Sequence, residues 1–188
     1  MDVLEAIRGR YTADAFGEKA PPRDVIERLI DCSVWAPNHW LTEPWTFHVI
    51  AGEEREQMGK ALVEWLHSDG YPETPDEDEL RRASGTAMRS PVMIVVSQTA
   101  DSEGGAGRAL EDYASCCCVT QNLMLAAHAE GLVTKWATGR SISYQGIKDY
   151  LGLDEADRIV GFVMLGYAAE EAPSDRARKP PKIDWRGI

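Results

Sequence analysis

The chain has 188 residues, 44% of them hydrophobic, and a formal net charge of -11. This length suits one well-buried core and is short for two, so we expect a single domain over residues 1–188. The negative charge disfavours nucleic acids and anionic membranes as partners. No apolar run reaches the roughly 18 residues of a spanning helix and no signal peptide is recognised at the start, so we expect a soluble cytoplasmic protein.

Apolar periodicity and helix-boundary residues predict the elements of the first half of the chain. Two early helices precede the break at Pro37, and the second begins at a proline pair suited to a first helical turn. An acidic stretch with glycine and proline is predicted to be a solvated loop or lid. The expected elements are helices at residues 2–8, 22–35 and 53–67, a strand at 46–50, and the loop at 68–79.

The second half of the chain contains a continuous apolar run, Val92 to Val96, that is typical of a strand covered on both faces. The segment DSEGGAG lacks the ending of a phosphate-binding P-loop and is predicted to be a plain loop. The expected elements are strands at residues 91–97, 132–136 and 159–167, a loop at 101–107, a long helix from 109 that ends at Gly131, a short helix at 143–151, and an extended basic tail at 168–188.

One weakly polar stripe on the long helix is predicted to face the core. Its members recur at three- and four-residue steps and are Tyr113, Cys117, Thr120, Met124 and Ala127. The four cysteines give neither a disulfide framework nor a zinc-ligand spacing, so we expect small core residues and no metal site at Cys32, Cys116, Cys117 and Cys118. Four strands interleaved with helices predict an α+β fold, with helices around a central mixed or antiparallel sheet.

Four segments, in matching order along the chain, resemble the FMN-dependent nitroreductase family, in particular its compact, short-chain subgroup. The string Gln121-Asn122-Leu123 through Gly131-Leu132 to Trp136-Ala137-Thr138-Gly139 is similar to the family's long helix and Trp-x-Thr-Gly ending. The other similar segments are Arg8-Gly9-Arg10-Tyr11-Thr12, Trp35-Ala36-Pro37-Asn38-His39 with Glu43-Pro44-Trp45, and Arg178-Lys179-Pro180 with Ile183 and Trp185.

The resemblance implies a nitroreductase-like homodimer with FMN at the subunit boundary and a C-terminal tail that reaches across the partner. It implies that Arg10 and Thr12, flanking Tyr11, bind the FMN phosphate, because a guanidinium and a hydroxyl match phosphate oxygens. The tail residues Arg178 and Lys179 would complete this cradle. The flavin ring would be contacted by Trp136, Ala137, Thr138 and Gly139 and, from the other subunit, by Trp35, Pro37, Asn38 and His39.

Several positions depart from the family pattern. Asp14 stands where many members have a basic residue, Leu41 replaces an asparagine, Glu43 a glutamine, and Ala137 a base of the compact subgroup. A cation near the flavin pyrimidine stabilises the anionic reduced ring, so its loss lowers the reduction potential. Either another basic residue, such as Arg8 or Lys135, supplies the missing positive charge, or the protein binds flavin without the usual reductase efficiency.

Three functions follow, and the sequence leaves all three open. The leading hypothesis is an oxidoreductase that passes hydride from NAD(P)H through FMN to a small electron-poor acceptor, a nitroaromatic or quinone, by a ping-pong mechanism; no protein side chain is assigned a catalytic role. The alternative is a flavin-binding storage or sensing protein with little turnover. A third is a scaffold that has lost flavin. The choice between NADH and NADPH has no sequence signal.

Overall fold

The computed structural model describes residues 1–68, 74–101, 105–173 and 177–187. Its centre is an antiparallel sheet in which the strands lie in the order β1-β2-β4-β3. The expected alternatives of a mixed or antiparallel sheet are thereby resolved. The strands are β1 (Trp45–Ala51), β2 (Val92–Gln98), β3 (Val133–Ala137) and β4 (Arg158–Gly166).

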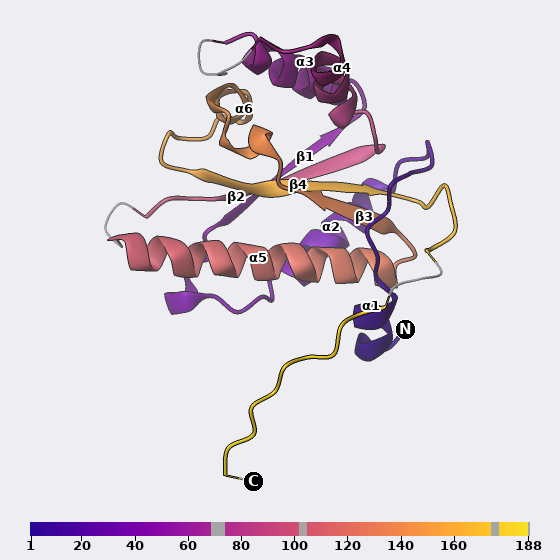
Figure 1. The fold of residues 1–188 in the computed structure, drawn as a ribbon, viewed down its shortest axis with the longest axis vertical. Coiled ribbons are helices and arrows are strands. Elements are labelled where there is room, and N and C mark those ends of the chain that lie inside the picture. The colour runs from indigo at the N-terminus through magenta and orange to yellow at the C-terminus, as the bar shows by residue number, and fades with distance from the viewer. Residues whose placement is uncertain (69–73, 102–104, 174–176, 188) are drawn as a thin grey trace.

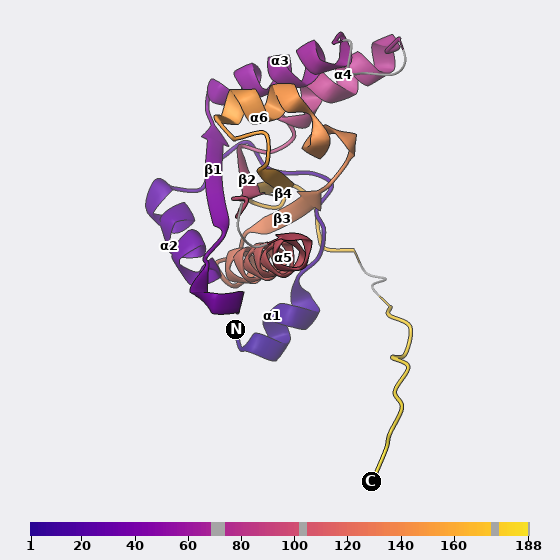
Figure 2. The ribbon, with the colours of Figure 1, turned by 90° about the vertical axis from the view of Figure 1, so that its left-hand side faces the viewer.

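Helices cover both faces of this sheet, which makes three layers (Figures 1 and 2). One face is covered by α3 (Glu54–Leu66), α4 (Glu77–Thr86) and α6 (Gln145–Leu151). The other is covered by α2 (Arg23–Ser33) and α5 (Gly105–Ala129), and α1 (Val3–Gly9) packs on the outside of α5. Two short 3₁₀ helices, η1 (His39–Leu41) and η2 (Arg140–Ser143), lie in connecting segments.

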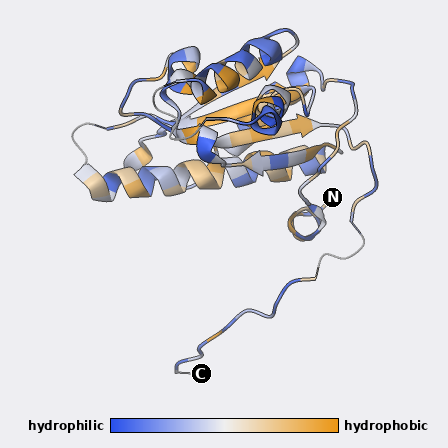
Figure 3. Cartoon of the chain, turned by 45° about the horizontal axis from the view of Figure 1, so that its top comes forward, coloured by the Kyte–Doolittle hydropathy of each residue, from blue (hydrophilic) through white to orange (hydrophobic). Residues whose placement is uncertain are grey.

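The central strands are buried on both faces because the sheet lies between two helical layers. Every residue of β2 is buried, and its side chains alternate: Ile94 and Val96 belong to the core under α2 and α5, whereas Met93 and Val95 belong to the core under α3 and α6. Figure 3 shows the apolar strands between helices in which polar and apolar residues alternate. The prediction of a strand covered on both sides is therefore confirmed.

A β-bulge in β4 changes which face its side chains occupy. Val96 pairs with Gly161, but the next residue, Ser97, pairs with Ile159, so β4 carries one extra residue here. A Cβ atom at Gly161 would collide with the Nε1 atom of Trp136 on the neighbouring strand β3. Gly161 therefore lets the indole of Trp136 lie across β4, close to the backbone.

The expected strands and helices are present with boundaries that shift by a few residues, with one addition. Residues 77–79 were expected in a loop but begin helix α4, because Asp76 and Glu79 form a capping box. The remaining part of that predicted loop includes residues 69–73, which lie outside the described residues. The glycine-rich segment at 101–107 is also only partly a loop, since α5 already begins at Gly105.

The predicted core stripe of α5 is confirmed at Thr120, Met124 and Ala127, which are buried. Tyr113 and Cys117 are only partly buried, because in the first half of the helix the buried positions are Cys116 and its neighbours on the same face. Burial raises the pKa of the Cys116 thiol to about 12, so this thiol stays protonated. The expectation of a core position is wrong for Cys32, which is exposed because it lies on the outer side of α2.

We predict that Gly161→Ala destabilises the protein by about 1–3 kcal/mol, because the added methyl group displaces Trp136. The urea midpoint measures this loss. Gly85→Ala, on α4 with open space at its Cβ position, is the matched control and should be neutral or stabilising by up to about 1 kcal/mol. Equal midpoints for the two variants would show that Trp136 does not depend on Gly161.

Candidate functional site

The segment after α1 extends the sheet at the edge of β3. Thr12 forms a parallel bridge with Thr134, and the amide of Ala13 donates a hydrogen bond of 3.1 Å to the carbonyl of Thr134. Two segments that are far apart in the sequence are thereby joined. The predicted phosphate-binding residues Arg10, Tyr11 and Thr12 lie along the strand that leads into Trp136, Ala137, Thr138 and Gly139.

Unpaired buried polar atoms cluster in these joined segments. The Nε of Arg10, the Oγ1 of Thr134 and the Nε1 of Trp136 are buried and have no hydrogen-bond partner among the described residues. Such groups cost about 1–3 kcal/mol each unless water or a ligand satisfies them. The Nε1 of Trp136 lies against Gly161 of β4, so the Nε of Arg10 and the Oγ1 of Thr134 are the donors that fit an oxygen-rich anionic ligand such as the phosphate of FMN.

Asp14 and Lys135 form an ion pair at the same edge. The Lys135 Nζ donates to the Asp14 Oδ1 at 2.6 Å, and the Lys135 side chain is only 23% exposed. This hydrogen bond and charge hold the pKa of the Asp14 carboxyl below its usual range, with a small contribution from Arg89. Lys135 is one of the two bases proposed to replace the positive charge that the family has at position 14, and it lies directly beside Asp14. The negative charge of Asp14 offsets part of the positive charge of Lys135.

The loop between α2 and β1 presents two tryptophans to the surface in an unfavourable backbone conformation. Trp35 is 85% and Trp40 79% exposed. Trp40, Leu41 and Glu43 have positive φ angles of 56°, 54° and 44°, a region that side-chain-bearing residues rarely adopt. Strain of this kind persists only where the surroundings enforce it, and it is concentrated at functional sites.

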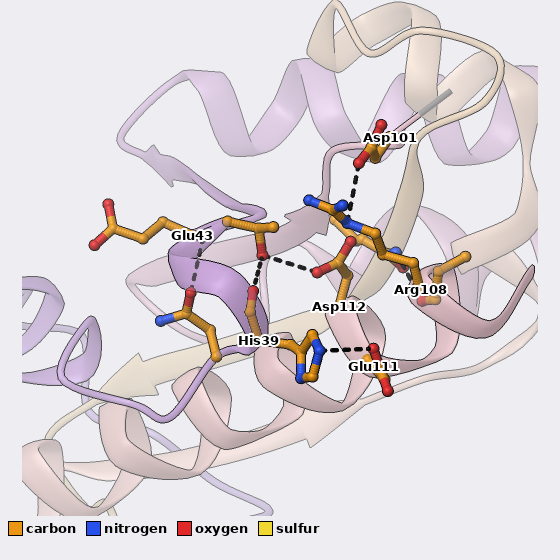
Figure 4. A network of polar contacts seen from close by, with 10 residues as sticks. His39, Glu43, Asp101, Arg108, Glu111 and Asp112 are labelled. Carbon is orange, nitrogen blue, oxygen red and sulfur yellow. Dashed lines mark hydrogen bonds and ion pairs between the residues drawn. The ribbon is translucent and has the colours of Figure 1, made fainter. Parts of the chain in front are cut away.

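Hydrogen bonds to the first part of α5 enforce this loop conformation (Figure 4). Thr42 Oγ1 donates to Oδ1 of the buried Asp112 at 2.8 Å, and the His39 Nε2 lies 3.7 Å from a carboxylate oxygen of Glu111. The backbone amide of Glu43 donates a hydrogen bond of 3.1 Å to the Oδ1 of Asn38. Asn38 and His39 are thus held in place, while Trp35 and Pro37 remain exposed beside them.

A single chain does not bring the loop to the β3 edge. His39 contacts Glu111 near the start of α5, whereas Gly9, next to Arg10, lies against His128 near its end. The 17 residues that separate Glu111 from His128 correspond to about 25 Å of helix. This distance exceeds the reach of one FMN molecule, so both groups can contact the same ligand only if they come from different chains.

The C-terminal tail is also separate from Arg10 within one chain. It leaves the sheet beside the N-terminal segment, where the amide of Gly17 donates to the carbonyl of Tyr167 at 2.9 Å. It then runs away from the body of the molecule (Figures 1 and 2). Arg178 and Lys179 are exposed there, and Arg178 donates to the carbonyl of Ala177 in the same tail.

Large apolar side chains are exposed on the helices and segments outside the sheet. They lie on α1, at the start of α5, in the loop after α2, and on the tail. The residues, each at least half exposed, are Val3, Leu4, Ile7, Trp35, Trp40, Leu41, Leu110, Ile183 and Trp185. Large exposed apolar side chains at both ends of α5 and on the tail are candidates for burial in a protein interface.

The sequence model of the Nitroreductase family matches residues 7–167. The chain belongs to the nitroreductase family. It is 29% identical over 166 residues to the Escherichia coli protein YdjA, provisionally named an NAD(P)H nitroreductase, with 88% of each chain covered. The crystal structure of a nitroreductase-like protein from Bacillus cereus is 29% identical and superposes with a TM-score of 0.83, covering 96% of this chain and 92% of that one.

A second solved structure, a Bacteroides fragilis nitroreductase with bound FMN, has the same fold with a TM-score of 0.73, 22% identity and 98% coverage of each chain. The predicted α+β, nitroreductase-like fold is therefore confirmed. In the part of the chain that the structure describes, we find no helix capable of crossing a bilayer and no cluster of potential metal ligands.

Sequence reasoning missed two features of this region. Asp112 was not singled out, although an acidic residue one turn before Cys116, on the same helix face, is a detectable sign of a buried polar contact. Thr134 was treated only as part of a strand. Its unpaired hydroxyl became recognisable only when the segment around Thr12 was seen to lie beside it.

Proposed function

We propose that this nitroreductase-family protein is an FMN-dependent NAD(P)H oxidoreductase that reduces a small electron-poor acceptor, a nitroaromatic or a quinone. The unpaired buried Nε of Arg10 and Oγ1 of Thr134, in the two segments joined at the β3 edge, carry this proposal, because both can donate to the phosphate oxygens of FMN. The names of the relatives agree, since YdjA is provisionally an NAD(P)H nitroreductase and the B. fragilis protein contains FMN.

We infer that the functional unit is a homodimer in which each flavin contacts both chains. Arg10 and Thr12 of one chain would hold the phosphate, together with Arg178 and Lys179 of a tail. The backbone of residues 136–139 would lie along the ring, and Pro37, Asn38 and His39 of the other chain would approach it. The 25 Å separation along α5, the apolar outer surface and the projecting tail all support this arrangement.

Bound FMN would accept hydride from NAD(P)H and deliver it to the acceptor, with the two substrates occupying one ring face in turn. The protein needs no nucleophile or general acid for this role. Its residues neutralise the phosphate, exclude water from the ring and set the local charge. The position of Lys135, paired with Asp14, decides how much positive charge is available near the ring.

The alternative function is a flavin-binding storage or sensing protein, and the Asp14–Lys135 pair is the observation that favours it. A carboxylate at 2.6 Å cancels much of the field of Lys135. With less positive charge near the ring, the anionic reduced flavin is less stabilised, which slows turnover.

An absorption spectrum of the purified protein, before and after anaerobic addition of NADH or NADPH, tests the proposal. A flavin spectrum that bleaches on addition and returns with a nitroaromatic or quinone supports the oxidoreductase. A yellow protein that does not bleach favours storage or sensing. A colourless protein that does not take up added FMN contradicts both. Parallel double-reciprocal lines are expected for the ping-pong order, and intersecting lines would contradict it.

We predict that Arg10→Ala weakens FMN binding by about 1.5–3 kcal/mol, the usual contribution of a charge-assisted hydrogen bond. Fluorescence titration of the apoprotein measures the affinity. Arg23→Ala is the control, since Arg23 is a 91% exposed residue paired with Glu27 on α2. An unchanged affinity in the Arg10 variant would remove this residue from the phosphate site.

We predict opposite shifts of the flavin reduction potential for the two partners of the ion pair. Asp14→Asn leaves the charge of Lys135 uncompensated and should raise the potential by tens of millivolts, whereas Lys135→Gln should lower it. Dye-coupled equilibration measures both values. Shifts in the same direction, or none, would place this pair too far from the ring to tune it.

We predict that a chain ending before Arg176 loses both bound flavin and dimer stability, because the tail is exposed on its own chain. Size-exclusion chromatography with absorbance at the flavin band measures both. Substitution of Arg178 and Lys179 by glutamine in the full chain separates the two effects, since it should release flavin but leave the dimer. A truncated protein that elutes as a yellow dimer would contradict the role of the tail.

A further inference from the structure

A pocket of about 430 Å³ lies between α3, α4 and η2, on the side of the sheet opposite α5. Its apolar wall contains Leu62 and Leu66 of α3. Arg82 of α4 and Arg140 of η2 also line it, and Glu79 contributes a carboxylate. Its volume lies in the range of small-molecule sites, and its lining is mainly polar, with the two leucines on one side.

The pocket adjoins the predicted flavin segment. Gly139 lines the pocket and is also the last residue of the segment 136–139 that would lie along the ring. Arg140 follows immediately and begins η2. A flat molecule placed on the ring near Gly139 can therefore extend into the pocket between Leu62 and the two arginines.

The two arginines make the pocket locally positive in a protein of net charge -11. Among the ion pairs found for the described residues, none involves Arg82 or Arg140, whereas their neighbour Arg81 pairs with Asp78. The carboxylate of Glu79 is drawn toward the start of α4, where it accepts the amide of Asp76 at 3.4 Å. Two guanidinium groups thus outnumber the one lining carboxylate, and that carboxylate has a capping role.

We propose that this pocket, which we call the α4–η2 pocket, binds the oxyanion group of a substrate whose reactive ring lies on the flavin. Guanidinium groups recognise carboxylate and phosphate through paired, charge-assisted hydrogen bonds, and the leucines pack against the rest of the molecule. The oxyanion is either the carboxylate of an aromatic acceptor or a phosphate of NAD(P)H. The assignment of the ligand to a flavin substrate rests on the proposed function.

The test uses the flavin-loaded full chain with Arg82→Gln, Arg140→Gln and, as the matched control, Arg81→Gln. Acceptor selectivity is measured as kcat/KM for 4-nitrobenzoate relative to uncharged nitrobenzene, with NADH as donor. Donor use is measured separately as the rate of anaerobic flavin bleaching at limiting NADH and NADPH. Flavin absorbance per chain verifies that each variant retains its cofactor.

Loss of at least about tenfold in the 4-nitrobenzoate to nitrobenzene ratio, with unchanged bleaching, assigns the pocket to an acceptor carboxylate. A similar loss in the rate of flavin bleaching, with an unchanged 4-nitrobenzoate to nitrobenzene ratio, assigns the pocket to a dinucleotide phosphate. The Arg81 variant should match the unmodified protein in both. If the Arg82 and Arg140 variants leave both quantities unchanged, or lower activity with charged and uncharged substrates equally, the proposal is overturned.

Calorimetric titration of the oxidised, flavin-loaded protein with 4-nitrobenzoate and with NADP⁺ separates this proposal from the proposed function, because neither compound can transfer hydride to the flavin. Binding of either anion that weakens about tenfold in both pocket variants supports the pocket even if the flavin does not bleach. In that case the oxidoreductase assignment fails and the anion site stands. Absence of binding to the unmodified protein, together with unchanged kinetics in the variants, overturns the pocket while the oxidoreductase assignment stands.

Discussion

The burial of β2 and β4 on both faces is the constraint on which the rest of the structure depends. Because the two faces of β2 belong to two different cores, neither helical layer can be removed without exposing an apolar surface. The bulge at Gly161 is part of this constraint, since it redirects β4 and provides room for Trp136. The sheet centre is thus filled by packed side chains.

The buried polar groups of the candidate site lie outside this apolar centre, at the sheet edge and near the ends of α5. At the β3 edge, the segment around Thr12 pairs with Thr134 and leaves buried donors unpaired. At the start of α5, the buried Asp112 holds a strained loop that exposes Trp40. Both places have unsatisfied or strained groups beside a rigid scaffold, which is the usual arrangement at a binding site.

The distance between these two places is the reason that the proposed function requires a dimer. One chain has buried, unpaired donors at one end of α5 and a loop with exposed tryptophans near the other end, about 25 Å away along the helix. Two chains packed through the exposed apolar residues of α1 and α5 could place the loop of one beside the edge of the other. The α4–η2 pocket extends the same edge beyond Gly139, so the flavin site and its substrate site would share one continuous surface.

Local sequence patterns determined most secondary structure and the family. The apolar run Val92 to Val96 indicated a doubly covered strand, and the ordered motifs from Arg10 to Gly139 identified the nitroreductase resemblance, because such signals depend on neighbours in the chain. Only the tertiary structure decided which distant residues meet. The pairing of Lys135 with Asp14, the unpaired hydroxyl of Thr134 and the presence of Arg82 and Arg140 around one pocket arise from packing between separate elements, and no periodicity encodes such proximity.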